Sequence, residues 1–215
     1  MLSFVEEITL LLLDDAKGEF VDMPIAAFST VVAGAALMDL AMHNRIDTDL
    51  ERLTIVDPSP TGDAILDDAM KQITEAGTDL RVLEAIDRIG LQVEHYSAEA
   101  LRRLVSHGIL KEENGRFLWV FRTRRYPVID DTEQREVKAR LRQILLTDEI
   151  PDPRDVVLIC LIDACKLFGL VLSEDELDRA TPRVEQLRKM DLIGQAVAKA
   201  VADIQFIFKL ATSAV

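Results

Sequence analysis

The sequence predicts a mainly α-helical fold, a single compact domain of several helices with one small β-hairpin. Apolar residues recur at helical spacing along most of the chain. One Asn-Gly pair, the strongest hairpin signal in the chain, occurs at Asn114-Gly115. No internal repeat or low-complexity linker divides the 215 residues. We therefore expect one domain over residues 1–215.

Helical spacing in the first half of the chain is interrupted by turn signals from glycine, proline and aspartate. Pro24 can open a helix at its first turn, and the uncharged run 23–38 is too short to span a bilayer, which predicts a buried helix. The expected elements are helices over 2–13 and 25–43, a short strand over 53–56, a helix beginning at Thr61 or Asp63, and a helix over 80–89.

The second half holds the predicted hairpin. Ser97 is expected to cap a helix that runs to 107, and Gly108 is placed to end it. Strands are expected over 109–111 and 117–121, on either side of Asn114-Gly115. The remaining predicted helices are 132–146, 153–170, 173–179, and 181 to the C-terminus with a break near Asp191.

Charge is distributed unevenly. Lys and Arg number 25 against 38 Asp and Glu, a net charge of −13, so the chain as a whole should be repelled by nucleic acid and by anionic membranes. Residues 100–145, however, contain eleven Lys or Arg against six Asp or Glu. This window therefore carries five net positive charges, within a remainder that carries eighteen net negative ones.

The densest basic motif is Phe121-Arg122-Thr123-Arg124-Arg125-Tyr126-Pro127. Arginine can hold a phosphate in a bidentate fork, and aromatic side chains can rest at the headgroup level of a membrane. The predicted lipid-binding residues are Arg122, Arg124 and Arg125, with Arg102 and Arg103 on the preceding helix. The predicted membrane or oligomer contacts are Trp119, Phe121 and Tyr126. In the alternative reading Trp119 and Phe121 belong to the core, and the arginines pair with carboxylates.

Two other functions fit the same segment. The hairpin could form a protein-interaction or homo-oligomer contact, with Trp119 and Tyr126 as anchors. Residues 97–126 also have the outline of a winged helix that binds DNA, but phosphate contacts supply most DNA affinity and the acidic remainder opposes them. No nucleic-acid partner is therefore expected.

The sequence shows no catalytic constellation. His43, His95 and His107 are isolated, and no glycine-rich phosphate loop is present. Cys160 and Cys165 lie five residues apart in an apolar run, so on a helix they point apart, and no cluster supplies metal ligands. We expect free thiols in a reducing cytosol, no secretory signal, no cofactor and no enzymatic activity.

Four segments, in order, resemble the Golgi phosphoprotein 3 family over essentially the whole chain. The segments are the helix from Leu2-Ser3-Phe4 to Asp14-Asp15, the run Gly34-Ala35-Ala36-Leu37-Met38-Asp39 leading to Asn44-Arg45-Ile46, the motif Pro60-Thr61-Gly62-Asp63 followed by Leu66-Asp67, and His95-Tyr96 ahead of Gly108-Ile109-Leu110. The resemblance implies a helical domain with a projecting hairpin, no catalysis, and peripheral attachment to membranes from the cytoplasm. In eukaryotic members it implies binding of phosphatidylinositol 4-phosphate and a link between Golgi glycosyltransferases and the vesicle coat.

The family's headgroup pocket uses a tryptophan and three arginines. The matching positions here are Asp22-Met23-Pro24, Ala33, Glu94 and Ser97. The arginine-bearing N-terminal tail of eukaryotic members is also expected to be missing, as in a prokaryotic relative. The resemblance therefore implies binding to anionic phospholipid through the hairpin, with weakened headgroup specificity.

Overall fold

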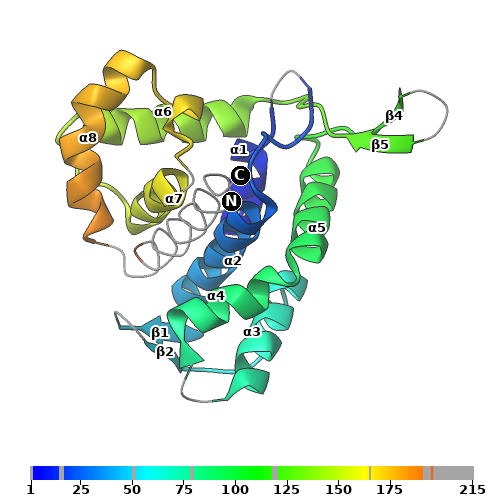
Figure 1. The fold of residues 1–215 in the computed structure, drawn as a ribbon, viewed down its shortest axis with the longest axis vertical. Coiled ribbons are helices and arrows are strands. Elements are labelled where there is room, and N and C mark those ends of the chain that lie inside the picture. The colour runs from blue at the N-terminus through cyan, green and yellow to red at the C-terminus, as the bar shows by residue number, and fades with distance from the viewer. Residues whose placement is uncertain are drawn as a thin grey trace, which may run out of the picture.

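The computed structural model describes residues 2–14, 17–49, 52–77, 80–117, 121–164, 166–190 and 195, and in them the fold is mainly helical. The helices are α1 (Phe4–Leu11), α2 (Ile25–Met42), α3 (Ala64–Ala76), α4 (Val82–Gly90), α5 (Val93–Ser106), α6 (Thr132–Leu146), α7 (Pro153–Ala164) and α8 (Glu174–Arg188), with a 3-10 turn at Phe168–Leu170. Strands β4 (Glu113–Phe117) and β5 (Phe121–Arg125) form a hairpin that projects from the helical body (Figure 1). The predicted fold class is confirmed.

Helix α2 is the centre of the core. It contacts α1, α3, α4, α5 and α7, which surround it. Its alanines and Gly34 are small enough for neighbouring helices to approach closely. Among the described residues, α2 alone has the length and the apolar composition to cross a membrane. However, 72% of it is buried inside the fold. The expectation of a buried helix at 25–43 is confirmed.

The N-terminus of α1 is fixed by two polar side chains. The Ser3 hydroxyl accepts a hydrogen bond from the Glu6 N–H at 3.1 Å, and the Glu6 carboxylate accepts one from the Ser3 N–H at 2.7 Å. Asp39, buried on α2, accepts the N–H groups of Phe4 and Val5 at 3.1 and 3.3 Å. Burial raises the pKa of Asp39 to about 6, against the effect of these bonds.

A charge network with buried carboxylates joins α1 to α6 and α7. Glu7 accepts from Arg154 at 2.8 Å, and Arg140 Nε donates to Asp155 at 2.6 Å. The Arg154 guanidinium also lies over the Phe4 ring, 4.2 Å from its centroid. Burial raises the pKa of Glu7, and Arg154 opposes that rise. The network holds the C-terminal helices against the first helix.

The base of the hairpin is locked to the loop that follows α1. Gly18 has φ +63°, and its carbonyl accepts the Tyr126 N–H at 2.7 Å. A Cβ atom on Gly18 would lie 2.5 Å from the Pro127 nitrogen, so glycine is required by close approach as well as by φ. Tyr126 packs against a second apolar cluster that includes Leu104 and Leu110. The projecting hairpin therefore starts from a rigid base.

The position of the hairpin turn was predicted wrongly. Asn114 lies inside β4, opposite Arg124, and the strands close at the pair formed by Phe117 and Phe121. The predicted first strand, 109–111, has other partners: Leu110 bridges Val128, and the Lys111 N–H donates to the Pro127 carbonyl at 3.0 Å. Because residues 109–111 pair with the segment around Val128, they are not part of the hairpin. The hairpin strands are instead residues 113–117 and 121–125.

Short strands of two to four residues were mostly missed. β1 (Ile46–Thr48), β2 (Arg52–Ile55) and β3 (Leu80–Arg81) form an antiparallel sheet in that order. Only β2 matches the expected strand at 53–56. The predicted helix 80–89 begins two residues later, at Val82, because residues 80 and 81 form a strand that pairs with Leu53 and Arg52. Two-residue pairing of this kind leaves no periodic signal in a sequence.

Three helix limits also differ from prediction. Ser97 lies inside α5, where its hydroxyl donates to the Val93 carbonyl at 2.7 Å instead of capping the helix. Helix α7 ends at Ala164, and Lys166 adopts a left-handed φ of +59° before the 3-10 turn. Helix α8 continues through Pro182 because Ala180 and Val184 on either side of it are buried. Cys165 and the predicted break near Asp191 lie outside the described residues.

Candidate functional site

The hairpin concentrates arginine positions on one face of its backbone. The register places Arg116 opposite Arg122 and Asn114 opposite Arg124. Because successive residues of a strand alternate between faces, positions 116, 122 and 124 share one face. For Phe121, Arg122 and Arg124 the structure describes the backbone, and Trp119 lies outside the described residues. The sequence between positions 117 and 121 is Leu-Trp-Val, which is wholly apolar.

Arg125 and Tyr126 lie at the base of the hairpin. Arg125 Nε donates to Glu19 at 3.0 Å, and both side chains are roughly half exposed. Tyr126 is half-buried against the second apolar cluster. The structure thus places these two residues beside the loop after α1, at the root of the element that carries Arg122 and Arg124.

Arg102 and Arg103 are neighbours on α5 but have different surroundings. Arg102 is 67% exposed and forms a bidentate pair with Glu99 at 2.6 and 2.8 Å. Arg103 is 18% exposed and donates to Asp63 at 2.6 and 3.1 Å and to Glu99 at 2.9 Å. Arg103 therefore ties α5 to the start of α3, while Arg102 faces solvent.

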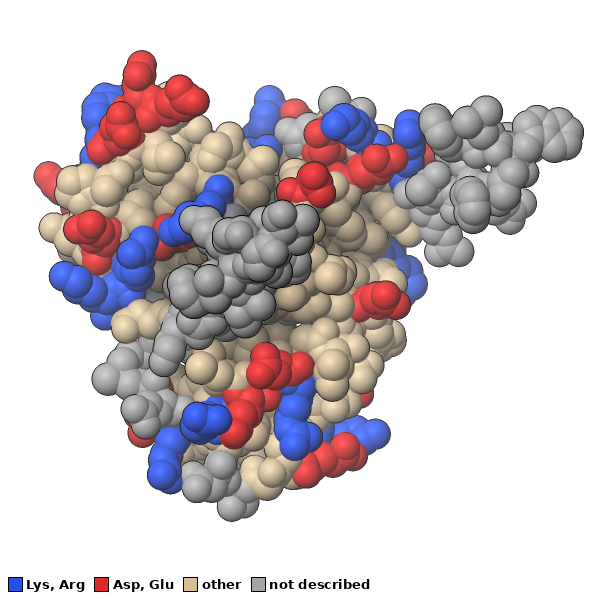
Figure 2. Space-filling model, viewed as in Figure 1, with Lys and Arg blue, Asp and Glu red and all other residues tan. Residues whose placement is uncertain are grey.

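The pKa shifts of the partner carboxylates agree with the different surroundings of Arg102 and Arg103. Burial raises the pKa of Asp63, but hydrogen bonds from Arg103 outweigh it and leave the pKa below its usual value. Hydrogen bonds from Arg102 and, secondarily, Arg103 lower the pKa of Glu99 to about 2. Figure 2 shows Lys and Arg side chains interspersed with Asp and Glu side chains over the face in view.

Sequence reasoning missed both carboxylate partners. Glu99 precedes Arg102 and Arg103 by three and four residues, a spacing that could have revealed the pair on a helix. Asp63 is forty residues from Arg103, and no local pattern connects them. This contact comes only from the packing of α5 beside the loop before α3.

The motif Pro60-Thr61-Gly62-Asp63 has a structural role at the start of α3. Asp63 caps the helix by accepting the N–H groups of Ile65 and Leu66 at 2.8 and 3.3 Å. Asp67 accepts from the Thr61 N–H and hydroxyl at 2.6 and 2.7 Å. These bonds account for the spacing of the motif.

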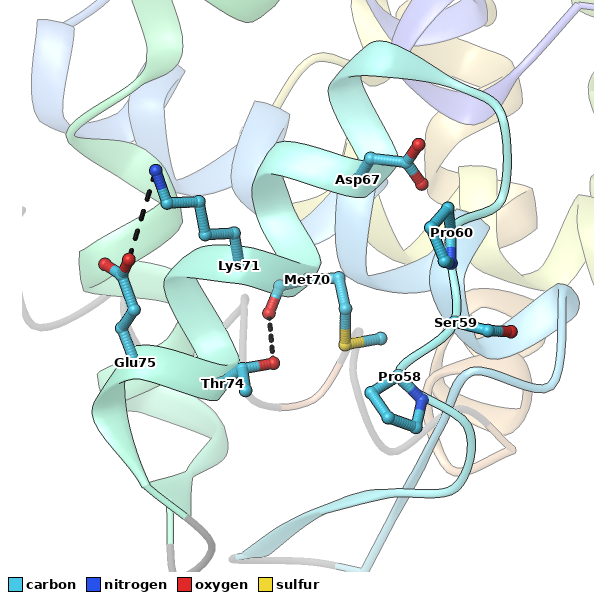
Figure 3. A pocket seen from close by; sticks show the side chains of 8 residues that line it. All are labelled: Pro58, Ser59, Pro60, Asp67, Met70, Lys71, Thr74 and Glu75. Carbon is cyan, nitrogen blue, oxygen red and sulfur yellow. Dashed lines mark hydrogen bonds and ion pairs between the residues drawn. The ribbon is translucent and has the colours of Figure 1, made fainter.

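A pocket of about 250 Å³ opens between residues 58–60 and α3 (Figure 3). Pro58, Pro60 and Met70 form its apolar wall, and the Lys71–Glu75 pair, at 3.9 Å, lies along the same helix. The pocket is apolar with a charged rim. It is separate from the arginines of the hairpin.

The positions matched to the family's headgroup pocket carry no arginine. Ala33 and Ser97 are buried in α2 and α5, which contact each other, and Glu94 is exposed. Over the described ranges, no group of three or more His, Cys, Asp or Glu side chains is placed to share a metal ion. The arginines that could bind an anionic ligand are therefore sought in the hairpin and α5.

The structure is thus a helical body from which a hairpin with arginines on one backbone face projects. The chain belongs to the Golgi phosphoprotein 3 (GPP34) family, whose model matches residues 4–204, so the resemblance is confirmed. Members of this family are non-enzymatic sorting proteins, as expected here, and in eukaryotes they are cytosolic peripheral Golgi proteins that bind phosphatidylinositol 4-phosphate.

Two fungal relatives share this similarity. The vacuolar protein sorting-associated protein 74 of Eremothecium gossypii is 25% identical over 224 residues, covering 86% of this chain and 67% of that protein. The protein of the same name from Schizosaccharomyces pombe is 27% identical over 224 residues, covering 86% and 66%. The chain therefore spans about two thirds of the length of these curated relatives.

Proposed function

We propose that this chain is a cytoplasmic, peripheral membrane protein that binds anionic phospholipid through its basic hairpin, with weak headgroup selectivity. The observation that carries the proposal is the register, which places Arg122 opposite Arg116 and puts Arg124 on the same face of a projecting element. Like charges directly opposite each other destabilise a strand pair. An anionic surface attracts both arginines and so offsets the repulsion between them.

The expected binding is modest. A basic residue near an anionic surface contributes about 1 kcal/mol, and the contribution falls off over a Debye length. Arg122 and Arg124 supply most of it in this proposal. Arg125 and Arg102 already pair with Glu19 and Glu99, so they contribute less. Arg103 is held by Asp63 and Glu99 and ties α5 to the start of α3, so it contributes least to the surface charge.

Aromatic residues extend the contact. Trp119 and Phe121 belong to the apolar run 117–121 at the closed end of the hairpin sequence. Rings of this kind favour the headgroup level of a bilayer. Tyr126 is half-buried at the base of the hairpin, so in this proposal it lies at the edge of the membrane contact nearest to the helical body. The proposal thus combines a charged face with an apolar end.

Phosphatidylinositol 4-phosphate, the ligand of eukaryotic relatives, is a ligand here by resemblance only. Each hydrogen bond to a charged group contributes about 1.5–3 kcal/mol, and the positions of Ala33, Glu94 and Ser97 cannot supply them as arginines do. We therefore propose general anionic selectivity. The same departures fit a prokaryotic member of the family, an origin that is part of the proposal.

Charge reversal tests the proposal. The variant Arg122→Glu/Arg124→Glu/Arg125→Glu should lose binding to vesicles that contain anionic lipid, at physiological salt. A control variant with the same change in net charge is Arg81→Glu/Arg88→Glu/Arg135→Glu, whose residues are exposed and lie outside the hairpin. It should keep most of the binding. Equal binding by both triple variants would refute the assignment to the hairpin.

The competing function is a protein-interaction module in which the hairpin forms a homo-oligomer contact. A projecting element with an apolar end suits such a contact as well. In this case the hairpin variant would change the molar mass measured by light scattering without lipid, and the wild type would not sediment with vesicles. Lipid dependence therefore separates the two functions.

A further inference from the structure

Two arginines of α8 line a second pocket that the proposed function does not use. Arg179 and Arg183 stand one turn apart on α8, and the pocket, of about 280 Å³, lies between them and the C-terminal end of α6. Thr147 and Gln186 contribute polar atoms, and Leu145 closes the apolar side. Figure 1 places α8 and the hairpin at opposite sides of the helical body.

Neither arginine has a carboxylate partner among the described residues. Arg179 Nε donates to the Asp175 carbonyl at 3.4 Å, and Arg183 donates to the Gln186 side-chain oxygen at 3.3 Å and to the Glu149 carbonyl. Across the same α6–α8 interface, by contrast, Arg142 pairs with Glu176. Two guanidinium charges are thus left with neutral acceptors in a strongly acidic chain.

One polar atom in this group has no hydrogen bond. The Arg183 Nε is shielded from solvent and lacks an acceptor in the described part of the chain. A buried unpaired donor is costly, so such an atom calls for a ligand or another explanation. Asp148 also lines the pocket, but no ion pair within 4.0 Å joins it to Arg179 or Arg183. The two guanidinium groups outnumber the one carboxylate of the lining, so the pocket keeps a net positive charge that suits an added anion.

We propose that this pocket is an anion site that takes a phosphate group, held between the guanidinium groups of Arg179 and Arg183. A carboxylate has two oxygens and one charge, which a single arginine can satisfy. Two guanidinium groups carry two positive charges, which match the charge of a phosphate monoester, and a bound phosphate would replace the neutral Gln186 acceptor of Arg183. The phosphate could belong to a soluble ester or to a phosphorylated lipid headgroup, because both present the same oxygens.

Calorimetric titration with inorganic phosphate tests the site in the full chain. We expect saturable binding of one phosphate per chain, weakened about tenfold to hundredfold by Arg179→Ala or by Arg183→Ala. Arg179→Ala is the safer variant, because Arg179 bonds only to a carbonyl of its own helix, whereas Arg183 also holds the Glu149 carbonyl. Arg88→Ala is the matched control, since Arg88 is an exposed arginine outside any such pocket, and it should bind like the wild type.

Two further titrants identify the source of the phosphate. Glycerol phosphate represents a soluble ester, and vesicles of neutral lipid with phosphatidic acid represent a lipid monoester. The vesicles are tested with the hairpin variant Arg122→Glu/Arg124→Glu/Arg125→Glu, so that hairpin binding does not contribute. Binding of either titrant that Arg179→Ala weakens supports the site and names the source. Absence of saturable phosphate binding, or binding that Arg179→Ala and Arg183→Ala leave unchanged, overturns it.

Discussion

Replacing Arg103 by alanine should destabilise the fold far more than replacing its neighbour Arg102. Arg103 makes two hydrogen bonds to Asp63 and one to Glu99, all between 2.6 and 3.1 Å, from a side chain that is 18% exposed. Asp63 is in turn the cap of α3. The change therefore removes the tie between α5 and α3 and leaves a half-buried carboxylate without its cation.

The magnitude follows from this burial. Breaking a fully buried ion pair costs about 3–5 kcal/mol, and an exposed pair is worth about 0–1 kcal/mol. Arg103 and Asp63 are 18% and 28% exposed, so we expect Arg103→Ala to lower the free energy of unfolding by about 2–3 kcal/mol. Arg102 is 67% exposed and pairs only with a residue of its own helix, so Arg102→Ala should cost far less than Arg103→Ala.

Urea denaturation followed by circular dichroism measures both variants. A double-mutant cycle with Asp63→Ala isolates the pair, and its coupling energy should be about 1.5–3 kcal/mol. The Asp63→Ala change alone should cost about 1 kcal/mol more than Arg103→Ala, because the helix cap is lost with the pair. If Arg103→Ala proves no more damaging than Arg102→Ala, the tie between the helices does not stabilise the fold.

Three further predictions concern the core and the hairpin base. The buried carboxyl of Asp39 has its pKa raised to about 6, so the folded state binds more protons than the unfolded state from about pH 4 to 6. Stability should therefore fall by up to about 3 kcal/mol as the pH rises through this range, and Asp39→Asn should remove the fall; parallel pH profiles of the two proteins would contradict it. In urea denaturation, Gly18→Ala should lower the free energy of unfolding by at least about 1 kcal/mol more than Gly62→Ala. Both glycines have positive φ, but only a Cβ on Gly18 would clash with Pro127. Equal losses would show that the backbone at the hairpin base can shift to relieve the clash. Leu37→Ala, at a fully buried position of α2, should lower the free energy of unfolding by about 2–5 kcal/mol, and a loss below about 1 kcal/mol would mean that α2 is not central.

The long helices were predictable from sequence because their ends carry local signals. The limits of α6, 132–146, match prediction, and those of α2 differ by one residue. Asp63 was named as a possible cap, and the structure shows it accepting two N–H groups. Periodicity and caps act within one or two turns of a helix, so they are visible in a single sequence.

The remaining features depend on residues far apart in the chain. The hairpin itself was expected, but its turn was misplaced because the Asn114-Gly115 signal is local, while the partner of 109–111 is Val128 and its neighbours. For the same reason candidate arginines could be named from the sequence, but not their carboxylate partners. Glu19, which pairs with Arg125, lies more than a hundred residues away.

Vesicle co-sedimentation of the wild-type chain at physiological salt tests the central claim most directly. Three vesicle types are compared: neutral lipid, neutral lipid with a generic anionic lipid, and neutral lipid with phosphatidylinositol 4-phosphate. A charge-driven hairpin predicts binding to both anionic types, matched for surface charge, and none to neutral lipid, with binding weakened as salt rises. Absence of binding to any of the three would contradict the account and favour the protein-interaction module.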